Sequence, residues 1–272
     1  MKVVWKLVEA CIIPILTYAG ETRNPNKTEN RAINNILECI IKRILMVPRT
    51  TPREALYIET GIMDVEHTVM KNRINMEKRL SLNKENITYK VKENGGEKGW
   101  KYITNQIKNR IKIDDMEMEG SRTQVKNKVS EKVKEAFRKQ IEDSGADKSK
   151  IKYLMDTKNY QWEPGKPAPY IMQLTRQQAS AIFKAKTRML QIKENYKGKY
   201  QKSPNKLKCR ACKKEDETQQ HILNECEIIH TDNALKVQKD DLKSEKPEEL
   251  RKTSFRVMEI MKKLETIHQG GE

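Results

Sequence analysis

Four residues of the types that bind transition metals lie close together in the sequence, in the pattern Cys209-x2-Cys212-x8-His221-x4-Cys226. A Cys-x2-Cys pair presents two thiolates on one tight turn, and Zn²⁺ prefers four sulfur or imidazole ligands in a tetrahedron. We therefore predict a zinc site at these four residues. Because protein side chains fill all four positions, none is left for an activated water, and the zinc is expected to be structural.

The element that carries the second pair of ligands must meet a geometric condition. His221 and Cys226 are five positions apart, which places them about 140° from each other on a regular α-helix. Both can reach one metal ion only if a short helix ends or unwinds between them, and Asn224 is a candidate position for this. His230, four residues beyond Cys226, is an alternative to His221 as the ligand.

Positive charge is concentrated beside this pattern. The 272 residues include 55 Lys and Arg against 38 Asp and Glu, a formal net charge of +17. Residues 176–214 contain thirteen basic residues and a single acid, Glu194, so this segment alone carries +12. Such lysines can serve solubility alone. Here, however, Phe183, Tyr196 and Tyr200 are interleaved with the cations, and aromatic rings can stack on unpaired bases while cations bind phosphates.

The partner predicted from this segment is RNA or DNA. A membrane surface is excluded, because residues 195–208 lack the bulky apolar face of a membrane-binding helix. The predicted nucleic-acid contacts come from Arg176, Lys184, Lys186, Arg188, Lys193, Tyr196, Lys197, Lys199, Tyr200, Lys202, Lys206, Lys208, Arg210, Lys213 and Lys214.

Helical periodicity dominates the elements that must position these residues. Only 36% of the chain is hydrophobic, which argues against a large sheet, and apolar side chains recur at helical spacing through residues 28–47 and 64–82. Residues 51–54 predict a capping box that opens a short helix ending at Gly61, and Thr175 with Gln178 predicts a second capping box. Apolar residues at 125, 129, 133, 137 and 141 form a stripe suited to packing against another helix. The fold is predicted to be all-α.

Four segments are predicted along the chain. Residues 1–82 form a helical domain, and residues 83–162 form a helical linker region. Residues 163–232 carry the basic helix and the CCHC zinc knuckle, and residues 233–272 form a charged helical tail. The architecture is therefore a set of small helical modules followed by a zinc-knuckle module and a tail.

The remaining cysteines and histidines predict structural roles. Cys11 and Cys39 lie on apolar helical faces and are expected to be core thiols. An odd count of five cysteines indicates a reduced, intracellular protein, in the nucleus or the cytoplasm. His67 follows Asp64 and Glu66, but acids at a helix start are ordinary capping residues. No nucleophile–base pair is evident, so no catalytic residue is predicted.

Several short motifs, in order, resemble the C-terminal part of a non-LTR (LINE-type) retrotransposon reverse transcriptase. They cover about residues 1–82 and 174–226 and read LVEACIIPILTYAGET (7–22), RILMVP (43–48), TPREAL (51–56), ETG (59–61), the helix 174–190 with Arg188, and Glu217-Thr218 before His221 of the knuckle. The resemblance implies that residues 1–82 are thumb-like and that thumb and knuckle bind template RNA and target DNA. No Tyr/Phe-x-Asp-Asp motif occurs, and the palm that would carry the metal-binding carboxylates is missing. The implied role is therefore nucleic-acid binding, with a separately encoded palm as one partner, and RNA-directed DNA polymerase activity is not assigned to this chain.

Two alternatives remain open at this point. The chain could be a free-standing, zinc-stabilised helical adaptor whose stripe at residues 125–141 binds a partner protein. It could also be the product of a decayed open reading frame. A nucleic-acid-binding protein is expected to lose affinity steeply with salt, whereas an adaptor is not.

Overall fold

The computed structural model describes residues 1–23, 26–82, 85, 87–93, 99–158, 162–196, 207–231 and 233–269. Within these residues the fold is all-α, as predicted, and the only β-type pairing is an isolated bridge between Lys208 and Asp216. No described helix is both long enough and apolar enough to cross a membrane.

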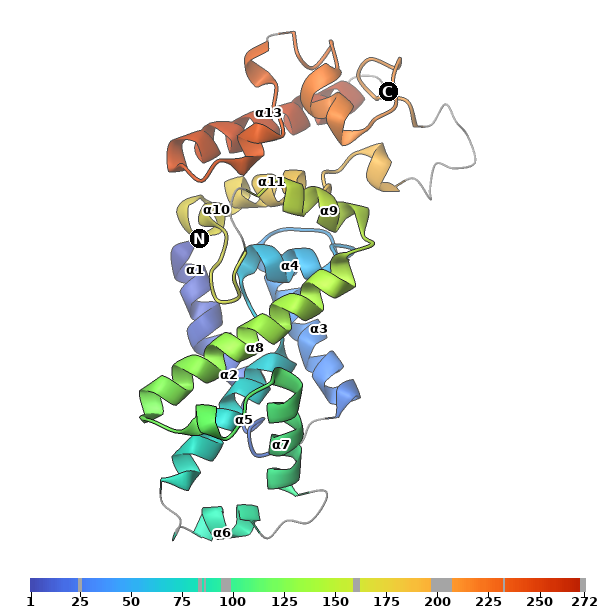
Figure 1. The fold of residues 1–272 in the computed structure, drawn as a ribbon. Helices are drawn as coiled ribbons and strands as arrows, with labels where there is room; N and C mark the ends of the chain where they lie inside the picture. Colours follow the sequence, from blue (N-terminus) through green and yellow to red (C-terminus); the bar gives the residue numbers. More distant parts are fainter. Residues whose placement is uncertain are drawn as a thin grey trace.

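The helices follow one another through the whole chain. They are α1 (Lys2–Leu7), η1 (Val8–Ile12), α2 (Ile13–Leu16), α3 (Lys27–Ile44), α4 (Arg53–Thr60), α5 (Val65–Ser81), α6 (Ile87–Glu93), α7 (Trp100–Ile111), η2 (Met116–Met118), α8 (Arg122–Gly145), α9 (Ser149–Asp156), α10 (Pro169–Gln173), α11 (Arg176–Lys186), η3 (Lys193–Tyr196), η5 (His221–Glu225), η6 (Asn233–Leu235), η7 (Asp240–Lys243) and α13 (Pro247–Gln269). Figure 1 shows α8 running obliquely across α5, and α11 and α13 side by side at the other end of the molecule.

Local sequence signals account for several helix ends. Thr175 and Gln178 form the predicted capping box at the start of α11. Asp64 caps α5 by accepting hydrogen bonds from the backbone and the ring of His67, so the acid beside this histidine is a capping residue, as expected. Gly61 ends α4 in the left-handed region at φ +67°, a conformation that glycine adopts without steric cost.

The predicted capping box at residues 51–54 is wrong. α4 begins at Arg53, after Pro52, and no side chain caps it. The Thr51 hydroxyl instead donates to the Pro48 carbonyl at 2.7 Å, and the Glu54 carboxylate binds Lys148 Nζ at 2.8 Å. The tertiary contact with Lys148 thus replaces the local one.

The apolar stripe of α8 is buried inside the protein. Its five members pack mainly against α5 and α4, as the spacing of four predicts for a helix–helix contact. They are Val125, Val129, Val133, Phe137 and Ile141. This stripe is therefore not available to a partner protein, which removes the feature on which the adaptor alternative depended.

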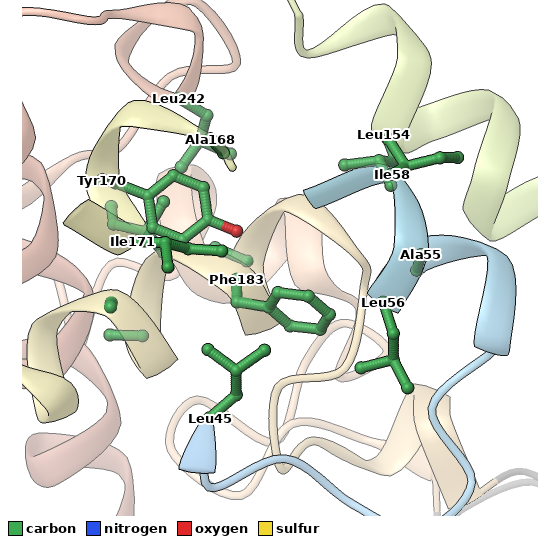
Figure 2. Close-up of a cluster of buried hydrophobic side chains, with 14 of the residues drawn as sticks. Leu45, Ala55, Leu56, Ile58, Leu154, Ala168, Tyr170, Ile171, Phe183 and Leu242 are labelled. Carbon is green, nitrogen blue, oxygen red and sulfur yellow. The ribbon is translucent and has the colours of Figure 1, made fainter. Parts of the chain in front are cut away.

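One large core connects segments that were predicted as separate modules. Figure 2 shows Leu45, which directly follows α3, and side chains from α4, α9, α10, α11 and η7 meeting in one cluster, with Phe183 near Leu45 and Leu56. The labelled members are Leu45, Ala55, Leu56, Ile58, Leu154, Ala168, Tyr170, Ile171, Phe183 and Leu242. The same core continues into α13, where Val257, Ile260 and Leu264 are fully buried. Residues 247–269 thus form a helix, as predicted, and its apolar face packs onto this core.

Cys11 and Cys39 are both exposed, so their prediction as core thiols is wrong. A helix turns about 100° per residue, and neighbours of each cysteine occupy the buried face. In the first helical stretch the buried positions are Trp5 and Val8. In α3 Glu38 turns inward, where its carboxylate accepts a hydrogen bond from Tyr57 at 2.9 Å, and Cys39 therefore faces outward.

Candidate metal centre

The first two ligand candidates lie on a tight turn between two short paired segments. The Cys209 amide donates to the Glu215 carbonyl at 2.7 Å, and the Glu217 amide donates to the Leu207 carbonyl at 2.9 Å. The turn from Cys209 closes through a 2.9 Å bond from the Lys213 amide to the Cys209 carbonyl, with Lys213 at φ +58°. This turn brings the two thiols into the same cluster.

The second two candidates come from a helical turn with an unusual hydrogen bond. η5 is a π-helix, and the Cys226 amide donates to the His221 carbonyl at 2.9 Å. In a π-helix each hydrogen bond spans five residues rather than four, so residue 226 lies about one turn above residue 221 instead of 140° away from it. The helix ends at Glu225, and Cys226 has an extended backbone. The predicted unwinding is therefore present, and it occupies the whole turn rather than Asn224 alone.

The four predicted ligands meet in one cluster that could hold a metal ion. One ligand atom from each of Cys209, Cys212, His221 and Cys226 lies within 4.8 Å of the others. The Sγ atoms of Cys209 and Cys226 are 3.8 Å apart, and Cys212 Sγ lies 3.3 Å from His221 Nε2. Tetrahedral bonds of about 2.3 Å to sulfur and 2.0 Å to nitrogen would separate two sulfurs by about 3.8 Å and sulfur from nitrogen by about 3.5 Å. These two separations are thus close to those of tetrahedral coordination, and the remaining ones are at most 4.8 Å.

His230 is not part of this cluster. Its ring is buried, and Nε2–H donates to the Ile222 carbonyl at 2.9 Å. Of the two candidate histidines, the structure therefore brings His221 to the three cysteines and uses His230 to hold the backbone of η5.

Burial and backbone hydrogen bonds divide the three thiols into two kinds. Burial raises the pKa of Cys209 to about 12 and also raises the pKa of Cys226. Burial acts the same way on Cys212, but backbone N–H groups of Glu215 and Lys214 and the contact with His221 outweigh it and lower that pKa to about 6. A metal ion binds thiolates, so it must displace the protons of Cys209 and Cys226 while Cys212 is ready to coordinate.

Glu217 positions the turn between Cys209 and Cys212, a role that the sequence alone does not predict. Its buried carboxylate accepts hydrogen bonds from the Arg210 amide at 2.9 Å, the Arg210 guanidinium at 2.8 Å and the Lys193 amide at 2.9 Å. It thereby connects the turn between the cysteines to η3. No local sequence pattern predicts the hydrogen bond between Glu217 and Lys193, because Lys193 belongs to another element, η3.

The predicted nucleic-acid contacts fall into two groups, one of which the structure describes. Lys197, Lys199, Tyr200, Lys202, Lys206 and the side chain of Tyr196 lie outside the described residues. Among the others, Lys186 is only 3% exposed and lies over the Tyr170 ring at 5.4 Å. Arg176 donates from Nε to the Ile44 carbonyl at 2.8 Å, and the Arg188 guanidinium lies 4.4 Å from the Tyr153 ring centre. These three cations contact protein groups, and Lys186 is inaccessible to a ligand.

The cations from Lys193 to Lys214 that the structure describes lie closer to solvent. Lys193 donates to the Lys208 carbonyl at 2.7 Å, and Arg210 is engaged by Glu217. Lys208 and Lys214 form partly or largely exposed ion pairs with Asp216 and Glu227, at 3.4 and 3.3 Å, and Lys213 is exposed. Exposed pairs contribute little free energy, so phosphates can replace these partners at small cost. Lys184 is half-buried in a cleft between α11 and α13.

Comparison with known proteins gives one result. No family model, curated protein or solved structure matches this chain significantly. The interpretation of the centre therefore depends on the geometry of its own residues.

Proposed function

We propose that this protein is a nucleic-acid-binding C-terminal portion of a non-LTR retrotransposon reverse transcriptase, which binds template RNA or target DNA through a basic segment beside a structural zinc knuckle. The observation that carries the proposal is the Cys3His cluster assembled within a lysine-rich segment. Three thiolates and one imidazole in a tetrahedron are a typical ligand set of structural Zn²⁺ sites. When bound, Zn²⁺ would supply folding free energy, since all four positions are taken by protein ligands.

The metal-binding segment also fixes the ends of the lysine-rich stretch. Residues 197–206 carry four lysines and no acid. On one side of this stretch, the Glu194 amide donates to the Glu217 carbonyl at 3.1 Å. On the other side, Lys208 accepts a hydrogen bond from Lys193 through its carbonyl. The described residues that flank this stretch are thus held to one another and to Glu217, so loss of the metal is expected to weaken phosphate binding by the stretch.

No catalytic step is proposed for this chain. The palm with its paired carboxylates would come from a separately encoded polypeptide or from a longer form of the same element. The protein would act inside the cell, in the nucleus or the cytoplasm, where its thiols remain reduced.

Binding measured against salt tests the proposal. Fluorescence anisotropy with labelled single-stranded RNA and DNA is expected to show log affinity falling linearly with log salt, by about 0.7 per phosphate contact. The test variant replaces Lys197, Lys199, Lys202 and Lys206 by alanine. The matched control replaces four exposed lysines elsewhere, namely Lys128, Lys139, Lys152 and Lys252. Affinity that does not change with salt, or a test variant that binds like its control, would overturn the proposal.

A further inference from the structure

A second basic surface lies away from the metal centre. A groove of about 500 Å³ runs between α5 and the first turns of α8. Figure 1 shows these parts of α5 and α8 toward the opposite end of the molecule from residues 207–231. Its lining includes Arg79, Arg122 and Lys126, together with the amides Asn72 and Asn75.

The cations of this groove are poorly neutralised. Glu21 is the one acid among its described lining residues, and no ion pair is found for Arg79, Arg122 or Lys126 in the described part of the chain. Lys71 lies nearby, and burial, followed by the charges of Lys134 and Lys126, lowers its pKa. Cations that repel one another in a concave site are stabilised by an anion that neutralises several of them together.

An exposed aromatic ring stands beside the groove. A second hollow shares Glu21 and Asn72 with the groove and is lined by Tyr18 and Lys71 as well. Tyr18 is 81% exposed, so its ring is accessible to a ligand bound in the groove. Proteins that bind single-stranded nucleic acids combine aromatic rings, on which bases stack, with a basic groove whose cations bind the phosphates.

We propose that this groove is a second binding site, for single-stranded nucleic acid, in which Arg79, Arg122 and Lys126 bind phosphates and Tyr18 stacks on an unpaired base. The amide side chains of Asn72 and Asn75 supply additional donors to phosphate or sugar oxygens. The site rests on α5, α8 and the turn that follows α2, and it shares no residue with the segment 176–214. It therefore extends the proposed function to a second surface at the other end of the molecule.

The experiment compares two triple variants of the full chain. The groove variant carries Arg79→Ala, Arg122→Ala and Lys126→Ala. The control carries Lys128→Ala, Arg251→Ala and Lys252→Ala, which removes the same charge from exposed positions outside the groove. Circular dichroism melts first establish that both variants fold. Anisotropy with labelled oligonucleotides is then expected to give a salt slope shallower by about 2 for the groove variant than for the control.

Tyr18 provides an independent readout. Tyr18→Ala is expected to lower affinity for single strands at least about fivefold, whereas Tyr18→Phe keeps the ring and retains binding. Inorganic pyrophosphate tests for a simple anion site. The nucleic-acid assignment is overturned if pyrophosphate no longer binds the groove variant while oligonucleotides bind both triple variants with the same affinity.

The outcomes also separate this inference from the proposed function. If the four lysines at 197–206 prove necessary for binding and the groove variant equals its control, the groove assignment fails alone. If the groove variant loses affinity and the 197–206 variant does not, the groove is established and the role of the basic segment fails. A wild-type protein that binds no nucleic acid refutes both.

Discussion

Replacing Cys212 by serine tests the metal centre with little damage to packing. Cys209 and Cys226 are 1% and 0% exposed and belong to the main core, so their replacement would disturb packing as well as metal binding. Cys212 is only partly buried and lies at the edge of that core. Serine at this position therefore removes one ligand and leaves the core nearly intact.

The expected loss of stability follows from metal binding to the folded state alone. With zinc about 1,000-fold above its dissociation constant, binding contributes about 4 kcal/mol to the free energy of unfolding. For a chain of this size, each kcal/mol shifts the Tm by about 2–4 °C, so the variant is expected to melt roughly 10 °C lower. Ile222 and Ile229 share their core with Val257 of α13. The whole cooperative transition should therefore move, rather than a separate knuckle melting early.

The assay compares melting with zinc and with a chelator for three proteins. Wild type and the control Cys39→Ser, whose cysteine is exposed and outside the cluster, should both lose the zinc-dependent part of their stability on chelation. Cys212→Ser should melt at the lower temperature under both conditions. Equal melting temperatures for wild type and Cys212→Ser in zinc would refute the reasoning.

Thiol counting gives a second measure within the same experiment. Cys11 and Cys39 are exposed and should react rapidly with a thiol reagent in the zinc-loaded protein. The three cluster cysteines should react only after chelation. Rapid reaction of all five thiols in the presence of zinc would show that the centre does not hold the metal.

Three further predictions concern the helical body. Glu59→Gln leaves the buried Lys158 without its partner at 2.6 Å and should cost roughly 3–5 kcal/mol in urea unfolding at pH 7. Burial acts to raise the pKa of Glu59, but Lys158 and a second lysine outweigh burial and lower that pKa. The ion pair therefore contributes to the free energy of unfolding above the ordinary pKa of 4.5, and this contribution is lost as the pH falls below it. A variant whose loss of stability persists unchanged into acid would contradict this. Gly61→Ala should lower stability by about 2–4 kcal/mol, because an added Cβ lies 2.6 Å from the Lys166 backbone and alanine is strained at φ +67°; an unchanged Tm would refute it. Arg73→Ala removes a buried guanidinium that hydrogen bonds to the backbone of two other segments, and should cost about 3 kcal/mol in the same urea assay, an expectation that a change below 1 kcal/mol would exclude.

Features set by neighbouring residues could be predicted from the sequence. The capping box of Thr175 and Gln178, the left-handed end at Gly61 and the stripe of α8 each depend on a few positions within one helix, where spacing fixes geometry. The Cys209–Cys212 pair of candidate metal ligands belongs to the same class, because two thiols on one tight turn converge whatever the rest of the chain does. These predictions are confirmed as geometry, while the identity of the metal stays a prediction.

The sequence by itself thus determined the all-α fold and the convergence of Cys209 and Cys212, whereas the fold decided that His221 rather than His230 joins the cluster with Cys226. Only the tertiary structure decided which cations face solvent, since Lys186 meets Tyr170 inside the core while Arg79, Arg122 and Lys126 gather from separate helices around one groove. Net charge in a window of sequence is additive, but exposure depends on what the fold places opposite each side chain. That dependence on distant residues is why counting charges found one basic segment, and the folded chain presents a second basic surface.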